Sequence, residues 1–461
     1  MQEKLRIDDT IAAIATPPGI GAVSIIRISG DAAVNIADGV FRGHDKLTHA
    51  RPNTIHFGRI ISHGEVADQV LASVFRAPHS YTGEDVVEIS CHGGEVTPAR
   101  ILDLVLSAGA RRADPGEFTR RAFVNGKLDL SQAEAVAELI AARGARFQQL
   151  SVGHLQGNLG ERVRAIRESL LDTCSLLEID LDFSEEGIEV IPTEKVMERL
   201  ARESLRVEEL IRSYEVGKVL RDGVRVAIVG PPNAGKSSLF NALLASNRSI
   251  VSPRPGTTRD YIEESVSFSG ILFSLVDTAG NREAEDEVES EGVRRSGEIE
   301  AGCDISLAVV DLTDVDGGSF WQRWLEGKDP SRVVVALNKV DLVPVAGKPS
   351  SFSRTGWRAV PVSALTGEGM EELRVELLGA GIGAGEIGDL GVVVTTKRVH
   401  DVLRRTRDAL GRARASAENG APNEFVALDT REAIAAISEV TGEVTSEEIL
   451  NNIFGQFCVG K

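Results

Sequence analysis

The sequence has few cysteines, and no two of them form a paired motif. The four are Cys91, Cys174, Cys303 and Cys458, and no C-x-x-C occurs, which argues against a zinc ribbon or a thioredoxin-like centre. No apolar run reaches the roughly 18 residues that a membrane-spanning helix needs. The first residues also lack the long apolar core and cleavage site of a secretory signal. These absences predict a cytoplasmic protein with reduced thiols and no membrane partner.

Basic residues are scarce relative to acidic ones. The chain has 51 lysines and arginines against 69 aspartates and glutamates, a net charge of −18. This balance argues against nonspecific coating of nucleic acid, which needs a broad basic face. A local patch is still allowed, and the arginines of 403–415 are the candidate, either as a contact to RNA phosphates or as a solvated helix face. Neither H-E-x-x-H nor G-x-S-x-G occurs, so zinc peptidases and α/β-hydrolases are not indicated.

The length of 461 residues predicts about three domains. In the middle of the chain, short apolar strands alternate with helical stretches, which is typical of a parallel sheet covered on both faces. The expected strands are Val224–Gly230, Ile271–Asp277, Ile305–Asp311, Val333–Lys339 and Ala359–Ala364. We expect this α/β unit to span 221–378.

Helical patterns flank this unit on both sides. The expected helical segments are Ser131–Leu150, Thr193–Leu220, Lys397–Ala417 and Asp429–Ile453, with capping boxes at Ser131/Glu134 and Thr445/Glu448. The pattern favours one helical domain made from 126–220 and 379–461, with the α/β unit inserted into it. The glycine-rich stretch 379–391 has the composition of a linker. Residues 1–125 mix strand and helix patterns and predict a separate α/β domain.

The stretch GPPNAGKSS (230–238) matches G-x-x-x-x-G-K-[ST] between an apolar strand and a helix, the context that this phosphate-binding motif requires. Its N–H groups would surround the phosphates, Lys236 would neutralise the terminal ones, and the Ser237 hydroxyl would ligate Mg²⁺. The expected nucleotide-binding residues of this loop are Asn233, Ala234, Gly235, Lys236, Ser237 and Ser238.

Two further motifs follow in the order found in GTPases. In GTTRD (256–260), Thr258 is the expected second protein ligand of Mg²⁺. In DTAG (277–280), Asp277 would hold Mg²⁺ through water and Gly280 would donate to the γ-phosphate. The GTP-binding residues expected in these segments are Ser252, Arg254, Pro255, Gly256, Thr257, Thr258, Asp277, Thr278, Ala279 and Gly280.

The motif NKVD (338–341) ends a later strand and predicts guanine recognition. The Asp341 carboxylate would accept from the two donors on the guanine edge, which adenine lacks, and such a mismatch costs roughly 1–3 kcal/mol or more. Asn338 would support the loop, the Lys339 stem would cover the base, and the Ser363–Ala364 pair would donate to the guanine carbonyl. In this order, the motifs predict a GTPase domain.

The motifs alone indicate several candidates for the residues that carry out hydrolysis. Asn281 stands where familiar GTPases have the water-positioning glutamine, and Arg282 either stabilises charge or pairs with the acidic loop that follows. The candidate general bases in that loop are Glu283, Glu285, Asp286, Glu287 and Glu289. Asn233 either ligates a monovalent cation or caps its own turn. The terminal FCVGK (457–461) is a prenylation box, a redox thiol, a frayed end or part of a site.

Seven segments, in order, resemble the MnmE (TrmE) family of tRNA modification GTPases over essentially the whole chain. They are ATPPGIGAVSIIRISG, YTGEDVVEISCHGG, DPGEFTRRAFVNGKLDLSQAEAVAELI, GPPNAGKSSLFNAL, GTTRD, DTAGNRE and FCVGK. The resemblance implies a homodimer formed through an N-terminal domain (1–125) that binds a tetrahydrofolate derivative. It also implies an FAD-containing partner protein, in a heterotetramer. Together the proteins would add a carboxymethylaminomethyl or aminomethyl group to carbon five of the wobble uridine of certain tRNAs.

The resemblance also assigns residues. It gives K⁺, in place of an arginine finger, to Asn233, Ser252, Arg254 and Thr257, and catalytic roles to Glu289 as general base and to Arg282. It gives the folate site to Arg27, Glu88, Lys127 and Lys461, which makes the tail part of that site. The alternative function is a regulatory GTPase that assists ribosome assembly, which would have no need for the folate residues.

Overall fold

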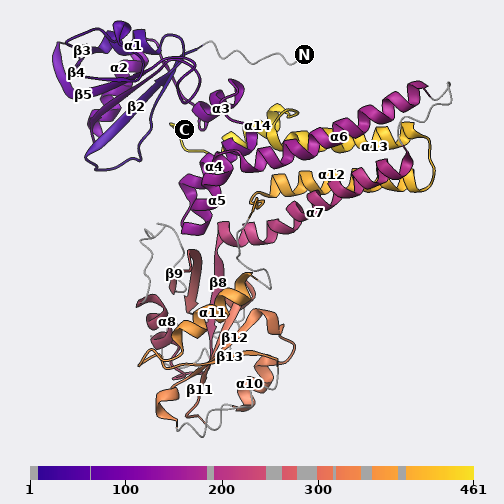
Figure 1. The fold of residues 1–461 in the computed structure, drawn as a ribbon. Helices are drawn as coiled ribbons and strands as arrows, with labels where there is room; N and C mark the ends of the chain where they lie inside the picture. The colour runs from indigo at the N-terminus through magenta and orange to yellow at the C-terminus, as the bar shows by residue number, and fades with distance from the viewer. Residues whose placement is uncertain are drawn as a thin grey trace. The chain divides into compact units, whose positions relative to one another are not determined.

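The computed structural model describes residues 9–62, 64–183, 192–245, 262–277, 298–314, 318–343, 356–382 and 391–461. The chain divides into two compact units (Figure 1). The first consists of Met1–Ala137, Gly153–Ala201 and Asp408–Lys461, and the second of Glu138–Val152 and Arg202–Arg407. The domain boundaries expected at 125, 220 and 378 stay predictions. Among the described residues, no helix is long and apolar enough to cross a membrane.

The first unit contains a seven-stranded sheet of order β3-β4-β5-β6-β2-β1-β7. Its strands are β1 (Ile11–Ile14), β2 (Val23–Ser29), β3 (Phe41–Gly43), β4 (Thr54–Ser62), β5 (Glu65–Phe75), β6 (Val86–His92) and β7 (Arg111–Arg112). Helices α1 (Ala33–Val40) and α2 (Val96–Ser107) share one buried apolar cluster with this sheet. Since side chains alternate along a strand, the residues between those of the cluster lie on the opposite face.

Two helices of the first unit come from opposite flanks of the chain and pair antiparallel. In α6 (Asn158–Phe183), Arg167 donates to the Ser438 hydroxyl of α13 (Asn423–Thr441) over 2.8 Å. Further along, Arg431 pairs with Glu178 at 2.7 Å. The prediction of a helical domain made from two chain segments is therefore confirmed. The other helices of this part are α3 (Glu117–Val124), α4 (Leu130–Ala141) and α14 (Glu447–Phe454).

The second unit contains a six-stranded sheet of order β13-β12-β11-β8-β10-β9. Its strands are β8 (Val224–Val229), β9 (Ile262–Phe268), β10 (Ile271–Asp277), β11 (Ile305–Asp311), β12 (Val333–Asn338) and β13 (Arg358–Pro361), and its helices include α8 (Lys236–Ala245), α10 (Gly318–Leu325) and α11 (Met370–Ile382). Three further helices, α5 (Ala145–Leu155), α7 (Thr193–Asp222) and α12 (Lys397–Glu418), each have residues in both units. The five predicted strands are parallel, as expected. The pattern missed β9, an antiparallel edge strand.

Two predicted helices are each broken in two. The segment 131–150 forms α4 and α5, which are separated at 142–144, where Gly144 lies. The segment 429–453 forms α13 and α14, and α13 ends at Gly442 with a φ of 82°, a left-handed conformation that glycine favours after a helix.

Both predicted capping boxes are displaced. Asp129, rather than Ser131, caps α4, because its carboxylate accepts from the Gln132 N–H while the Gln132 amide oxygen accepts from the Asp129 N–H, each over 2.9 Å. At α14 the cap is Ser446, whose hydroxyl accepts from the Ile449 N–H. In each case a neighbouring polar side chain of equal capping ability occupies the first position.

A buried ion network joins α3 to the sheet of the first unit. The guanidinium of Arg121, with 1% of its side chain exposed, donates to the Asp9 carboxylate at 2.6 Å, to Glu117 at 3.0 Å and to Glu84 at 3.3 Å. Burial alone would raise the pKa of Glu117, but hydrogen bonds from Arg111, the Asp114 N–H and Arg121 hold it below its usual value. Glu117 is therefore an anion that balances the buried cation.

Replacing Arg121 by methionine should destabilise the first unit by about 3–5 kcal/mol, because it leaves buried carboxylates without their cation. The matched control is Arg120→Met in the same helix, whose guanidinium bonds Asn451 at the surface and should cost about 1 kcal/mol or less. Thermal unfolding followed by circular dichroism measures both. All three tryptophans, Trp321, Trp324 and Trp357, lie in the second unit, so their fluorescence transition should stay unchanged. Equal stabilities of the two variants would contradict a role for the network.

Candidate functional site

The phosphate loop lies between β8 and α8 in the second unit. Asn233 and Gly235 have φ values of 64° and 91°, left-handed conformations that asparagine and glycine tolerate best. A Cβ on Gly235 would come within 2.3 Å of the Asn338 amide nitrogen, so this position requires glycine. The Lys236 ammonium donates to the carbonyls of Gly230 and Pro231, each at 2.9 Å, which places it over the loop.

The expected magnesium ligands lie close together at the end of β10. Asp277 is the last residue of that strand and is buried, and its carboxylate accepts from the Ser237 hydroxyl at 3.4 Å. The register of β8 and β10 pairs Asp277 with Ile228, and this alignment sets the carboxylate beside the phosphate loop. Two hard oxygen donors suit Mg²⁺, so the residues present fit this ion.

The base-recognition loop is tied to the phosphate loop by one buried amide. Asn338 donates from Nδ2 to the Ala234 carbonyl at 3.0 Å, and its Oδ1 accepts from the Ala364 N–H at 3.2 Å. Lys339 has a φ of 68° and bonds Asp311 at 2.6 Å. Burial would raise the pKa of Asp311, but hydrogen bonds from Lys339 and Thr313 hold it below its usual value. The Asp341 side chain is exposed, as a carboxylate that accepts from a base must be.

Eleven of the predicted nucleotide, metal and catalytic residues lie outside the described residues. They are Ser252, Arg254, Pro255, Gly256, Thr257, Thr258, Thr278, Ala279, Gly280, Arg282 and Glu289. Their roles in binding GTP, Mg²⁺ and K⁺ and in catalysis stay predictions. Of the predicted K⁺ ligands only Asn233 is described. Its side chain is exposed, and it makes no hydrogen bond to another described residue.

A second candidate site lies on the sheet of the first unit. Arg27 on β2 pairs with Glu88 on β6, and the strand register sets these residues directly opposite each other, with Nε and Oε1 2.8 Å apart. The Arg27 guanidinium also stacks on two rings, 5.2 Å from the centroid of Tyr81 and 5.6 Å from that of Phe118. Sequence reasoning missed both aromatics, although each lies in a segment that carried the family resemblance.

The C-terminal tail docks onto this site. Arg27 donates to the Gly460 carbonyl at 3.4 Å, and the Lys461 carbonyl accepts from the Phe118 N–H at 3.2 Å. A Cβ on Gly460 would lie 2.5 Å from the Ile14 carbonyl oxygen, so only glycine allows this approach. Burial and, next, the Arg27 cation lower the pKa of Lys461, while Glu88 acts in the opposite direction. The tail is thus part of the site, and a frayed end is excluded.

Two further candidates from the sequence are Lys127 and Cys458. The Lys127 ammonium donates to the Pro78 carbonyl at 3.1 Å, and no described contact joins it to Arg27 or Lys461. The Cys458 side chain is exposed, so it does not serve as packing. The structure therefore brings together Arg27, Glu88 and Lys461 of the four predicted folate residues.

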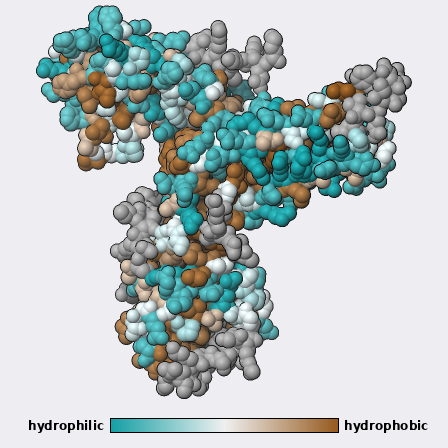
Figure 2. All heavy atoms as spheres, in the orientation of Figure 1, coloured by the Kyte–Doolittle hydropathy of each residue, from teal (hydrophilic) through white to brown (hydrophobic). Residues whose placement is uncertain are grey.

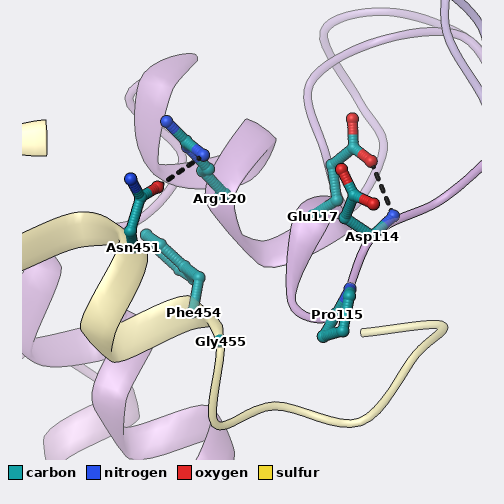
Figure 3. A pocket seen from close by; sticks show the side chains of 7 residues that line it. All are labelled: Asp114, Pro115, Glu117, Arg120, Asn451, Phe454 and Gly455. Carbon is teal, nitrogen blue, oxygen red and sulfur yellow. Dashed lines mark hydrogen bonds between the residues drawn. The ribbon is translucent and has the colours of Figure 1, made fainter. Parts of the chain in front are cut away.

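A cavity of about 240 Å³ lies where the tail leaves α14 (Figure 3). It is lined by Asp114, Pro115, Glu117, Arg120, Asn451, Phe454 and Gly455. Arg120 and Asn451 bond each other on one side, and Glu117 accepts from the Asp114 N–H on the other (Figure 3). None of the predicted folate residues lines this cavity, so it is distinct from the Arg27 site.

Comparisons with known proteins cover both units. Residues 130–458 match the family model of the MnmE helical domain, and residues 10–127 match that of the GTP-binding protein TrmE N-terminus. The chain is 43% identical over 466 residues to the tRNA modification GTPase MnmE of Chlorobium luteolum, covering 98% of each chain. It is 44% identical over 467 residues to the MnmE of Moorella thermoacetica, covering 99% of this chain and 100% of the relative.

Solved structures match part of this chain with low scores. The G domain of the T. maritima FeoB iron transporter is 28% identical, covers 34% of this chain and 98% of its own, and has a TM-score of 0.27. The strand order and phosphate loop of the second unit, rather than this score, define its fold.

The lowered pKa of Lys461 predicts that an anionic ligand binds with proton uptake. The pKa in the folded protein lies below the unfolded value, so stability rises with pH between the two and part of the amine is neutral there. A bound carboxylate raises the pKa again. Calorimetric titration with 5-formyltetrahydrofolate, at a series of pH values below the ordinary lysine pKa and in buffers of different ionisation enthalpy, should therefore show proton uptake.

The Lys461→Met variant should lose this proton uptake and bind about 10- to 100-fold more weakly, the loss expected for a charged hydrogen bond. Lys46→Met, at an exposed lysine of the same unit, is the matched control and should behave as wild type. Uptake that survives in Lys461→Met would assign the proton to another group.

Proposed function

Because this chain belongs to the MnmE (TrmE) family of tRNA modification GTPases, we propose that it hydrolyses GTP in the course of modifying tRNA. The observation that carries the proposal is the convergence of Lys236, Ser237, Asp277 and Asn338 around one phosphate loop. These groups would neutralise the phosphate charge, bind Mg²⁺ and position the guanine-recognition motif. Phosphoryl transfer from GTP requires these functions.

In the proposed hydrolysis, the chain stabilises charge that develops on the phosphates. Lys236 and the loop N–H groups would neutralise the phosphates, Ser237 and Thr258 would ligate Mg²⁺, and Asp277 would hold it through water. Glu289 would act as general base on the attacking water, with Arg282 assisting. Asn233, Ser252, Arg254 and Thr257 would hold K⁺, which would supply the positive charge of an arginine finger. The positive φ and exposed side chain of Asn233 support its role as a K⁺ ligand.

The first unit would supply the one-carbon group, from a tetrahydrofolate derivative. Folate carries a flat heteroaromatic ring and carboxylates. Tyr81 and Phe118 offer ring faces beside Arg27, and the two cations Arg27 and Lys461 converge there with Glu88. This combination of aromatic and cationic groups supports binding of a ligand that is flat at one end and anionic at the other. Lys127 belongs to this proposal only through the family resemblance.

The first unit would also form the homodimer. On the face of the sheet opposite the helices, Ile55, Phe57 and Leu71 are 67%, 66% and 45% exposed, and Phe57 lies opposite Leu71 in the register. Figure 2 shows apolar residues on the surface over β4 and β5. Such a cluster on a sheet face is typical of a protein interface. Sedimentation equilibrium of the full chain measures this association.

The proposed interface and the proposed folate site share one face. The registers place Ile55 opposite Ser73, Ser73 opposite Glu88, and Glu88 opposite Arg27. These four residues form one row across four strands. A second copy on this face would therefore lie beside the folate ligand.

The modification itself would need an FAD-containing partner protein, and the product would be a carboxymethylaminomethyl or aminomethyl group at carbon five of the wobble uridine. The alternative of a ribosome-assembly GTPase has lost its support, because the family match extends over both flanks of the GTPase unit.

The arginines of 403–415 stay a predicted tRNA contact, and several have acidic partners. The pairs are Arg407 with Glu208, Arg412 with Asp429 and Glu432, and Arg414 with Glu418.

GTP hydrolysis should be faster in K⁺ than in Na⁺, roughly tenfold or more, because a cation beside the phosphates does part of the work of an arginine finger worth 10³–10⁵-fold. Asn233→Ala should remove most of this difference. Asn53→Ala is the matched control, since Asn53 has a similar positive φ of 59° in the other unit. Phosphate release assays in the two salts decide, and equal wild-type rates would refute the K⁺ role.

Mass spectrometry of wobble uridine tests the proposed function as a whole. A strain that lacks this protein should lose the carbon-five modification, and the wild-type gene should restore it. Lys236→Ala should fail to restore it because the phosphates lose their cation, and Lys461→Met should fail because the folate site loses its own. A modification profile in the deleted strain that equals the wild-type profile would refute the tRNA assignment.

A further inference from the structure

The hairpin of β9 and β10 connects the two segments of the second unit that are expected to respond to nucleotide. β9 begins at Ile262, two positions after the predicted switch motif GTTRD (256–260), and β10 ends at Asp277, the predicted magnesium residue. Every residue of β9 pairs with one of β10, from Ile271–Phe268 to Asp277–Ile262. A ladder of seven pairs is about 20 Å long at roughly 3.3 Å per residue. The β9–β10 ladder therefore connects the predicted nucleotide site to the turn between these two strands.

The turn of this hairpin docks onto the start of α5 (Figure 1). Ser269 and Gly270 have φ values of 50° and 82°, the pattern of a two-residue type I′ turn. The Gly270 carbonyl accepts from the Arg146 N–H at 3.0 Å. That N–H lies in the first turn of α5, where no carbonyl of the helix itself is available. A Cβ on Gly144 would come within 2.9 Å of the Gly270 oxygen, so the approach depends on glycine.

Apolar packing reinforces the hydrogen bond. Phe147 of α5 is buried in the same cluster as Phe268, Ile271 and Phe273 of the hairpin. On the other side, a Cβ on Gly223, just after α7, would come within 2.8 Å of the Leu272 carbonyl oxygen. The hairpin is thus packed against α5 and approaches the backbone just after α7.

Helix α5 begins in a segment whose neighbours in sequence belong to the first unit. Residues Glu138–Val152 cluster with the second unit, although Met1–Ala137 and Gly153–Ala201 on either side belong to the first. Residues 138–152 are therefore continuous with first-unit residues at both of their ends. Polar and apolar contacts of this kind transmit small shifts because packed elements move as bodies.

We propose that the contact between the Ser269–Gly270 turn and the first turn of α5 conveys the nucleotide state of the second unit to residues 138–152, with Gly144 as the positioning residue. The inference rests on the GTP site proposed above. It requires that the turn and α5 stay joined and move together as the nucleotide changes.

Hydrogen exchange of the full chain, bound either to GDP or to a non-hydrolysable GTP analogue, tests this proposal. In the wild type, peptides within 138–152 should exchange differently in the two states. Gly144→Val should lose this difference while its affinity for both nucleotides stays near that of the wild type. Gly302→Ala is the matched control, because its Cβ would have no contact closer than 3.5 Å, and it should keep the difference.

Two results would overturn the proposal: no difference in the wild type, or a full difference in Gly144→Val. Tryptophan fluorescence and nucleotide affinity report whether the second unit of the variant is folded. The measurement involves no tRNA. A negative wobble-uridine experiment would therefore refute the proposed function without affecting this inference. A negative hydrogen-exchange experiment would refute this inference without affecting the proposed function.

A covalent lock gives a second arm that does not depend on the folding of Gly144→Val. A Cβ on Gly270 would lie 3.6 Å from the Ala145 Cβ, within the 3.5–4.5 Å range of disulfides, and 3.0 Å from the Arg146 Cγ, which must shift. Because Gly270 has a φ of 82°, the reduced double variant serves as the reference and must match the wild type in nucleotide affinity and tryptophan fluorescence. In Ala145→Cys/Gly270→Cys, with Cys458→Ser to remove the exposed thiol, oxidation should preserve the nucleotide-dependent difference. Loss of the difference on oxidation, with recovery on reduction, would show that the contact must open and would refute the proposal.

Discussion

The buried amide of Asn338 fixes the geometry on which the nucleotide site depends. One side chain donates to the carbonyl of Ala234 in the phosphate loop and accepts from the N–H of Ala364 in the base-recognition loop. The two loops follow different strands, and the Asn338 side chain forms a hydrogen bond with each of them. Gly235 must lack a side chain because the same amide occupies that space. The Asn338 side chain therefore requires a glycine at position 235, so the two motifs are linked by one steric constraint.

The parallel sheet makes this constraint possible. β8, β10 and β12 run in the same direction, so the phosphate loop, Asp277 and Asn338 all follow carboxyl ends at one edge. Ligands of open α/β sheets bind at that edge. Only β9 runs the other way, and for that reason its turn with β10 lies at the opposite end of the ladder, where α5 meets it.

Motifs made of neighbouring residues could be located from the sequence, whereas contacts between residues far apart in the chain could not. The phosphate loop and the NKVD motif could be found because their chemistry needs adjacent residues at fixed spacing. Spacing alone could not join Arg27 to Gly460, which are 433 positions apart, and only the family resemblance assigned Arg27 and the neighbouring Lys461 to one site. The capping positions failed because Asp129 and Ser131 are both good caps, and the choice depends on which side chain meets Gln132.

The first unit builds its site from the packing of the chain's end. The rings of Phe454 and Phe457 lie 5.6 Å apart and belong to the cluster that contains Leu130 of α4. From Phe457 the tail continues to Gly460, which has a left-handed φ of 97° and whose carbonyl accepts from Arg27. Because Gly460 also passes too close to Ile14 for any side chain, a shift of α14 cannot be absorbed at this point. The position of Lys461 beside Arg27 therefore depends on the helical packing around Leu130, so the chemistry of this site is tied to the integrity of the helices.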